Sequence, residues 1–294
     1  MNGFPELDDI HAQEYLIPPL SLSDEDLILF QDRILAFYTD HKRHFAWRET
    51  SDPYRILLSE VMLQQTQTSR VEPKYEEFLS LWPDFSSLST VSNEMLLSHW
   101  KGLGYNRRAL NLKKAARMTE CWNWTIPNDA KLIIQMPGVG ESTTAALLSF
   151  CYNEKSIYLE TNIRRVLLTC FYDHQSNIHD KELKALLHRL SLLTDDMKNW
   201  YYALMDYGVL LKNLFPNANV RSAHYTKQKK FENSNRQIRG QLIHLLTDTG
   251  AKDLDAVYRL LPHFEEERIY ACLLQLSAEG FVQECESVYK IRED

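Results

Sequence analysis

Apolar residues recur at helical spacing along most of the chain, and Gly, Pro and Asn separate one run from the next. Strand-like alternation of apolar and polar positions is absent from residue 53 to residue 211. This pattern predicts a series of helices, over residues 54–67, 73–82, 93–100, 107–119, 129–136, 142–151, 161–171, 181–193 and 199–211. We expect these helices to form an all-α body of two lobes with a cleft between them.

The end of the chain follows a different pattern. Three helices are predicted over residues 237–247, 253–261 and 264–279, and residues 281–291 then alternate like a short hairpin. This order is typical of a small α+β winged-helix module. The third helix begins with three consecutive glutamates at 265–267, which would repel DNA phosphates. Two roles for the module therefore stay open, reading DNA and packing or docking a partner.

Charge divides the chain into parts. Residues 1–25 are rich in acids and read as an arm, residues 26–216 form the helical body, residues 217–236 read as a basic linker, and residues 237–294 form the module. The net charge is −7, but the first 30 residues hold seven acids and no Lys or Arg, which leaves 33 acids against 33 bases elsewhere. Residues 101–117 and 212–240 are strongly basic. Local basic patches of this kind favour contact with phosphates. Their effect matters more for DNA binding than the negative net charge of the whole chain.

Other features limit where the protein works. The five cysteines are odd in number and not closely paired, which fits a reducing compartment. No apolar run has membrane-spanning length, and the N-terminus lacks the pattern of a signal peptide. We therefore expect a cytoplasmic monomer that has no membrane partner.

The turn Pro137-Gly138-Val139-Gly140 lies between two apolar helical segments. Its glycines let the chain reverse tightly and bring main-chain N–H groups close to a ligand, and a helix N-terminus binds anions. Twenty residues after Gly140, the lone acid Glu160 begins a helix that carries Arg164 and Arg165. A phosphate-binding turn followed by an acid indicates chemistry on DNA.

Further motifs lie upstream in the chain, around Trp47-Arg48, Asp52–Arg55, Ser59–Gln67 and Gly102–Tyr105. With these motifs, residues 47–208 resemble the helix-hairpin-helix DNA glycosylases, and within them the adenine glycosylase branch of the endonuclease III superfamily. The resemblance implies a two-lobed all-α helix-hairpin-helix body. It also implies a base excision repair enzyme that flips a mispaired or damaged base, most readily adenine, out of double-stranded DNA and hydrolyses its N-glycosidic bond.

The resemblance assigns catalytic roles to four positions. Glu60 matches the acid that protonates the departing base, and Glu160 matches the aspartate that stabilises the cationic sugar. Asn162 matches an asparagine that supports this carboxylate. Ser142 stands where strand-cleaving members carry a lysine, and because a serine cannot form a Schiff base, we expect a monofunctional glycosylase.

Other positions are expected to contact DNA or the base. Gln65 matches the residue that wedges into the duplex, and Tyr105 matches an aromatic that contacts the bases beside the lesion. Tyr202 stands where adenine-specific members place a Gln or Glu against the base. The remaining expected DNA contacts are Gly138, Val139 and Gly140 of the hairpin with Arg107 and Arg108, and Trp47 and Arg48 join Tyr202 in the expected base pocket.

The resemblance has consequences for cofactors as well. The family's iron–sulfur site needs four closely spaced cysteines, whereas beyond Asp206 the chain has only Cys272 and Cys285. We therefore expect no cofactor and no iron–sulfur cluster, while the resemblance allows a structural monovalent cation at the hairpin. The Nudix-like domain that reads 8-oxoguanine on the opposite strand is not recognisable in the chain.

Two departures from the family pattern keep other functions open. Glu160 is one methylene longer than the usual aspartate, and Tyr202 lacks an amide-like hydrogen-bonding group. An enzyme that releases a mismatched pyrimidine or a damaged purine is one alternative. A DNA-binding protein without catalysis is the other.

Overall fold

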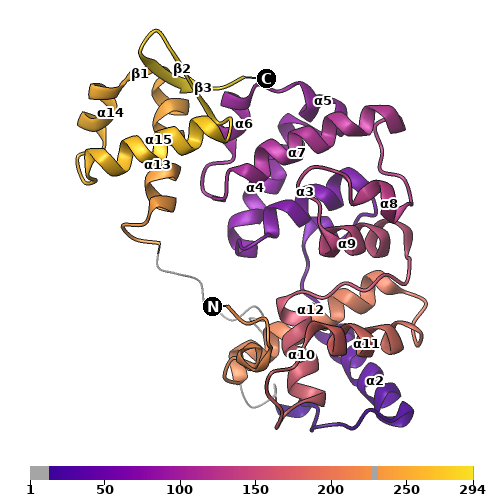
Figure 1. Cartoon of the computed structure of the whole chain (residues 1–294). Helices are drawn as coiled ribbons and strands as arrows, with labels where there is room; N and C mark the ends of the chain where they lie inside the picture. The colour runs from indigo at the N-terminus through magenta and orange to yellow at the C-terminus, as the bar shows by residue number, and fades with distance from the viewer. Residues whose placement is uncertain (1–12, 227–230, 294) are drawn as a thin grey trace. The chain divides into compact units, whose positions relative to one another are not determined.

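The computed structural model describes residues 13–226 and 231–293 of the chain. The described part is mostly helical, with one small three-stranded sheet near the C-terminus, as Figure 1 shows. This confirms the predicted fold class. This described part divides into two compact units, the first within residues 13–56, 128–134 and 139–226 and the second within residues 57–127, 135–138 and 231–293. No helix among the described residues is both long and apolar enough to cross a membrane.

The first unit is built around one long helix, α12. Its side chains Trp200, Tyr201 and Tyr207 are fully buried, and α10 and α2 pack against it. The unit contains η1 (Gln13–Tyr15), α2 (Asp24–His41), η2 (Ala46–Arg48), α8 (Ala130–Ile133), α9 (Glu141–Tyr152), α10 (Thr161–Phe171), α11 (Asp180–Ser191), α12 (Met197–Leu214) and η4 (Ala218–Arg221). Helix α3 (Pro53–Leu63) begins in this unit and continues into the second.

The second unit combines helices from the middle of the chain with the C-terminal module. Its middle part contains α4 (Thr68–Leu81), α5 (Phe85–Thr90), α6 (Asn93–His99), α7 (Arg107–Met118) and η3 (Thr119–Trp122). Local capping explains two of these starts. Asp84 and Ser87 form a capping box before α5, and the Ser92 hydroxyl accepts the Met95 N–H before α6.

The C-terminal module has the element order of a winged helix, namely α13 (Asn235–Thr249), β1 (Lys252–Asp253), α14 (Leu254–Leu260), α15 (Glu266–Ala278), β2 (Val282–Cys285) and β3 (Val288–Ile291). The antiparallel sheet has the order β1-β3-β2, with Cys285 opposite Val288. The two turn residues, Glu286 and Ser287, both have positive φ, as tight hairpin turns of this kind require. Sequence patterning predicts the three helices and the hairpin but not β1, which is too short to show alternation.

Some boundaries differ from those expected from the sequence. The helix expected over residues 54–67 ends at Leu63, because Gln65 adopts a left-handed φ of 56°. Parts of the expected arm and linker pack onto the first unit. The Leu20 N–H donates to the Cys170 carbonyl, and Ala223 and Ile178 are joined by a main-chain hydrogen bond. The acids Glu6, Asp8 and Asp9, and linker residues 227–230, lie outside the described residues.

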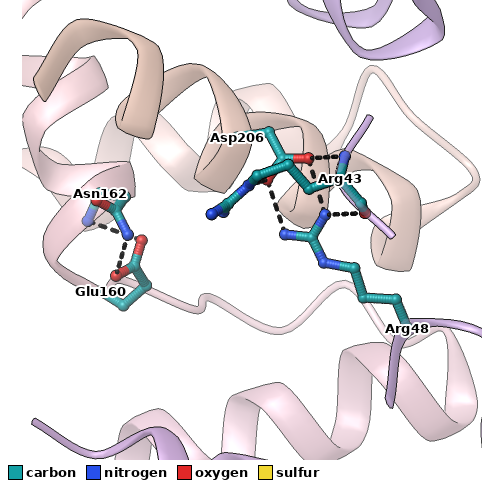
Figure 2. A network of polar contacts seen from close by, with 5 residues as sticks. All are labelled: Arg43, Arg48, Glu160, Asn162 and Asp206. Carbon is teal, nitrogen blue, oxygen red and sulfur yellow. Dashed lines mark hydrogen bonds and ion pairs between the residues drawn. The ribbon is translucent and has the colours of Figure 1, made fainter. Parts of the chain in front are cut away.

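A buried ion cluster ties α12 to the segment after α2. The Asp206 side chain is fully buried and accepts hydrogen bonds from Arg43 Nε at 2.6 Å and from both terminal nitrogens of Arg48 at 2.8 and 2.9 Å. Figure 2 shows both arginines converging on this carboxylate. A carboxylate buried to this degree is tolerated only because it is paired and hydrogen-bonded.

We expect Asp206→Asn to lower the free energy of unfolding by about 3 kcal/mol, because it leaves the buried guanidinium of Arg48 and the partly buried one of Arg43 without a counter-charge. Urea unfolding followed by tryptophan fluorescence would measure the loss. Asp195→Asn is the control, since that carboxylate is exposed and lies 3.5 Å from Lys155. Equal effects of the two substitutions would contradict a stabilising role for the buried cluster.

Candidate functional site

The hairpin contains one glycine whose backbone conformation excludes a larger residue. Gly138 has a φ of +78°, and a Cβ there would lie 2.8 Å from Asn111 Cβ, so the position requires glycine. Val139 is buried, Gly140 is the N-cap of α9, and Ser142 is exposed in the first turn of that helix. Gly138 and Gly140 are exposed, and the turn leads into the positive end of the α9 dipole, where a phosphate would be favoured.

Glu160 is held by the N-terminus of its own helix. It is the N-cap of α10, and its Oε1 accepts hydrogen bonds from the N–H groups of Asn162 and Ile163, both at 2.8 Å. Its other oxygen, Oε2, lies 3.4 Å from the side-chain nitrogen of Asn162 (Figure 2). Burial raises the pKa of this carboxyl, while the two N–H groups and the charge of Arg165 act in the opposite direction.

Asn162 is itself fixed from two sides. Its Oδ1 accepts a hydrogen bond from Arg165 Nη1 at 2.9 Å, and the same nitrogen donates to the Gly208 carbonyl at 3.1 Å. A Cβ at Gly208 would lie 2.5 Å from the Asn162 carbonyl oxygen. Gly208 therefore allows α12 to approach the first turn of α10 closely, and the amide beside Glu160 is positioned by this approach.

The three residues expected in the base pocket are buried in the first unit. Tyr202 is 3% exposed, its ring stacks on Phe150 with centroids 4.8 Å apart, and the Arg48 guanidinium lies 4.6 Å from its ring centroid. Trp47 stacks on Phe45 at 4.8 Å. Arg48 donates hydrogen bonds to Asp206, so it is a member of the buried ion cluster. Contact of Trp47, Arg48 and Tyr202 with a base stays a prediction.

Two residues of this cluster were missed by sequence reasoning. Arg43 and Asp206 lie 163 positions apart in the chain, yet Asp206 accepts hydrogen bonds from both the side chain and the main-chain N–H of Arg43. The one sign of this cluster in the sequence is Asp206 itself, an acid in an otherwise apolar helical run. Fully buried acids are usually paired, so such an acid indicates a partner but does not identify it.

Glu60 lies near the end of α3, among buried neighbours. Ser59 is 1% exposed and Val61 is 5% exposed, whereas the Glu60 side chain is partly accessible. The role of Glu60 as the proton donor to a departing base stays a prediction.

Gln65 and Tyr105 occupy two loops of the second unit and share an uncommon backbone conformation. Their φ angles are 56° and 47°, in the left-handed region that few residues other than glycine adopt. Both side chains are exposed, Tyr105 to 38%. Such strained residues persist only where the surrounding structure determines them, and they gather at functional sites.

Arg108 provides that surrounding structure. Its Nη1 donates to the carbonyls of Val61, Met62 and Gln64, and its Nη2 donates to those of Leu103 and Gly104, all at 2.7–2.9 Å. One guanidinium thus ties the C-terminus of α3 to both strained loops. Burial lowers the pKa of Arg108 to about 10, so the side chain stays charged at neutral pH.

Arg108 is therefore placed differently from what we expect from the sequence. It is 9% exposed, whereas a direct contact with DNA needs a guanidinium at the surface. The helix period explains the difference, because Arg107 and Arg108 are neighbours and face different directions on α7. Arg107 is the accessible one, and it pairs with Glu279 at 2.9 Å and lies 4.2 Å from the Phe281 ring centroid.

Comparisons with known proteins bear on this arrangement. Residues 58–191 match the family of HhH-GPD superfamily base excision DNA repair proteins. The matched segment contains Glu60, Gln65, Tyr105, the hairpin, Ser142, Glu160 and Asn162, whereas Trp47, Arg48, Tyr202 and the C-terminal module lie outside it.

Two relatives and one solved structure illustrate the range of similar proteins. An adenine DNA glycosylase of Buchnera aphidicola subsp. Baizongia pistaciae is 35% identical over 189 residues, which are 63% of this chain and 53% of that protein. A thymine/uracil-DNA glycosylase of Methanothermobacter thermautotrophicus is 29% identical over 62% of this chain and 84% of its own. The structure of a thermostable thymine-DNA glycosylase aligns with a TM-score of 0.56 and 27% identity, over 63% of this chain and 87% of its own. The chain spans about half the length of the first relative.

Among the described residues, no group of three His, Cys, Asp or Glu side chains is arranged to hold a metal ion. The monovalent cation at the hairpin and the lack of an iron–sulfur cluster both stay predictions.

We expect Arg108→Met to destabilise the protein by about 3 kcal/mol, because several buried carbonyls lose their charged donor together. Urea unfolding would measure the change. Lys114→Met on the exposed side of α7 is the matched control and should shift stability by less than about 0.5 kcal/mol. An Arg108→Met protein as stable as this control would show that the two loops do not depend on the guanidinium.

Proposed function

We propose that the chain is a monofunctional DNA N-glycosylase of base excision repair that hydrolyses the bond between a flipped base and its deoxyribose. The observation that carries the proposal is the position of Glu160. Within an HhH-GPD domain, its carboxylate is held at a helix N-terminus by two main-chain N–H groups and is flanked by Asn162. A carboxylate fixed in this way is preorganised to stabilise positive charge on a sugar.

The proposed reaction divides between two acids. Glu60 donates a proton to a ring nitrogen, so that the base leaves as a neutral group and the electrons of the glycosidic bond go to it. Glu160 stabilises the resulting sugar cation, and water adds at the anomeric carbon and gives up a proton. Because Ser142 offers no amine at the start of α9, the product is an abasic site rather than a cleaved strand.

Adenine in a mispair is the proposed substrate, within double-stranded DNA bound by a monomer. The 35% identical relative named adenine DNA glycosylase supports this choice. A second candidate is a mismatched pyrimidine such as thymine or uracil. Tyr202 at the base-contacting position and the similarity to thymine-acting proteins favour it.

A panel of duplexes, each with one mispaired or damaged base, would test the proposal. We expect one class of duplex to be cleaved after alkali treatment and to stay intact without it. Cleavage of adenine-containing mispairs would identify the first candidate, and cleavage of thymine or uracil mispairs the second. Tight binding without release of any base would instead favour a DNA-binding protein without catalysis.

We expect Glu60→Gln to reduce the single-turnover excision rate by at least about 100-fold, because an amide cannot donate the carboxyl proton. Binding of the same duplex should stay within about threefold, since charge and size at the phosphate contacts are unchanged. Glu76→Gln, on an exposed position of α4, is the control. An excision rate for Glu60→Gln close to that of the control would remove Glu60 from the mechanism.

Glu160 can be tested by its length and by pH. We expect Glu160→Gln to lose most activity and Glu160→Asp to retain an intermediate rate, because catalytic geometry is sensitive at roughly the 1 Å scale. The ionised form is the active one, and burial raises the pKa of this carboxyl. The wild-type rate should therefore decrease as the pH is lowered. The midpoint of this decrease should lie above pH 4.5, the ordinary pKa of a glutamate side chain.

Single-turnover rates measured across the acid range would show this decrease, with Glu154→Gln, at an exposed acid in the segment between α9 and α10, as the control. A wild-type rate that holds down to pH values below 4.5 would contradict the assignment of the acid limb to Glu160.

A further inference from the structure

The exposed side of α15, the third helix of the C-terminal module, carries an apolar stripe. Tyr270 is 41% exposed and Leu274 is 49% exposed, and Ala271 and Ala278 are exposed beside them. These positions recur every three or four residues, so they share one side of the helix. The exposed acid Glu267 begins the same side. We call the side formed by Glu267, Tyr270, Ala271, Leu274 and Ala278 the α15 face.

The opposite side of α15 is part of the module's own core. Ile269, Leu273 and Leu276 are fully buried where the helix packs against α13 and β2. The fold of the module therefore does not need the apolar side chains of the α15 face, and burying them against a partner would be favourable.

Other parts of the module face the middle of the chain. Phe231 and Arg236 line a pocket of about 750 Å³ together with Tyr105 from the loop before α7. Glu279, just after α15, pairs with Arg107 of α7 at 2.9 Å, and α13 packs against α6. These contacts join the module to the rest of the second unit, and they leave the α15 face exposed.

Negative charge lies at one end of the α15 face. Glu266 and Glu267 are exposed in the first turn of α15. Burial raises the pKa of the Tyr258 hydroxyl on α14, and the charges of Glu266 and Asp255 and the phenol of Tyr270 raise it further. Tyr258 and Asp255 therefore lie close to the start of α15. The face combines two tyrosine rings and an apolar stripe with acids at its beginning.

The module's own bases do not neutralise these acids. Residues 237–294 hold eleven Asp or Glu against six Lys or Arg. Arg268, the one base of α15, donates to the side chains of Asn233 and Asn235 at 2.9 and 3.0 Å. Exposed acids repel phosphates, whereas Lys and Arg side chains pair with them and stack on tyrosine rings. The charge of this surface thus favours a basic partner over DNA.

We propose that the α15 face docks a basic amphipathic helix of another protein, with apolar residues at every third or fourth position and Lys or Arg beside them. Tyr270 and Leu274 contact its apolar side chains, and Glu266 and Glu267 pair with its cations. This assigns a partner-docking role to the module. One helical face is smaller than a standard interface, so we expect a weak complex with a Kd of about 10 μM.

The test uses the full chain and three fluorescent peptides of about 18 residues, or five helical turns. The first, a Leu/Lys peptide, has Leu at helical spacing and Lys at the other positions. The second has Glu in place of every Lys, and the third has Ser in place of every Leu. Anisotropy titrations should show that the Leu/Lys peptide binds at least about tenfold more tightly than either of the others, because only it offers both complementary charge and an apolar side.

We expect Leu274→Ala and Tyr270→Ala each to weaken binding of the Leu/Lys peptide at least about fivefold, because each removes an apolar contact at the centre of the face. Leu260→Ala is the matched control, since Leu260 is 50% exposed at the end of α14. It lies two positions after Tyr258, so the two side chains are on different sides of that helix. The control should bind within about twofold of the wild type.

The contribution of charge is tested separately. We expect Glu266→Gln combined with Glu267→Gln to weaken binding of the Leu/Lys peptide at least about fivefold. Glu72→Gln combined with Glu76→Gln removes the same charge from exposed positions of α4, so it controls for general electrostatic attraction. A benzophenone group on the peptide should cross-link within residues 254–278.

Three outcomes would overturn the proposal. The first is a wild-type protein that binds the three peptides equally or binds none of them, and the second is a set of α15-face variants that bind like their controls. The third concerns duplex DNA, for which Leu274→Ala and Tyr270→Ala should keep the wild-type affinity within about twofold. A loss of duplex affinity as large as the loss of peptide affinity would assign the face to DNA. The proposal does not rest on the proposed catalysis, so a protein that releases no base would leave it standing.

Discussion

Helix ends leave main-chain groups without partners inside the helix, and the side chains that satisfy two such ends shape the candidate site of this protein. At the start of α10, the Glu160 carboxylate accepts two N–H groups. At the end of α3, the Arg108 guanidinium donates hydrogen bonds to the last carbonyls of the helix. It also donates to two carbonyls of the loop that precedes α7. Each is a charged group fixed by several hydrogen bonds to main chain, which holds it more rigidly than a single side-chain contact would. The position of the expected anion and the shape of the two expected DNA-contacting loops therefore follow from ordinary helix capping.

Sequence patterning predicts what depends on neighbours in the chain. The helix expected over residues 161–171 has those bounds in the structure, because its apolar period is clear and an acid stands at its start. The hairpin of the module is likewise local. What could not be predicted depends on groups that meet across long separations, such as Asp206 with Arg43 and Arg48. Arg108 shows the same limit, since two adjacent arginines look alike in sequence and only the packing of α7 buries one of them. Helix α5 and strand β1 were missed because each is too short for its period to be seen.

The C-terminal module illustrates how a pocket can be assembled from parts that carry no signal alone. Phe231 and Arg236 lie at the boundary of a polar segment that reads as a linker, and Tyr105 lies in a glycine-rich loop more than a hundred residues earlier. Ion pairs through Glu279 and Asp248 join these segments within one unit. The basic residues of the two stretches, at 101–117 and 212–240, therefore have different roles. Lys101, Arg107 and Arg239 form the ion pairs that hold the module, and Arg236 lines the pocket.

The longer side chain at position 160 raises the question of how the usual geometry is kept. Short acids are favoured at helix N-caps because their oxygens reach the N–H groups of the first turn without a detour. In this chain a single oxygen of Glu160 accepts both N–H groups, and the extra methylene is absorbed by turning the other oxygen toward Asn162. The orientation of that second oxygen then depends on Asn162, which is held by Arg165 and by the close approach of Gly208. Asn162, Arg165 and Gly208 are therefore jointly responsible for where the negative charge lies. We expect an aspartate at position 160 to recover this geometry only in part, because these three partners are placed for the longer side chain of Glu160.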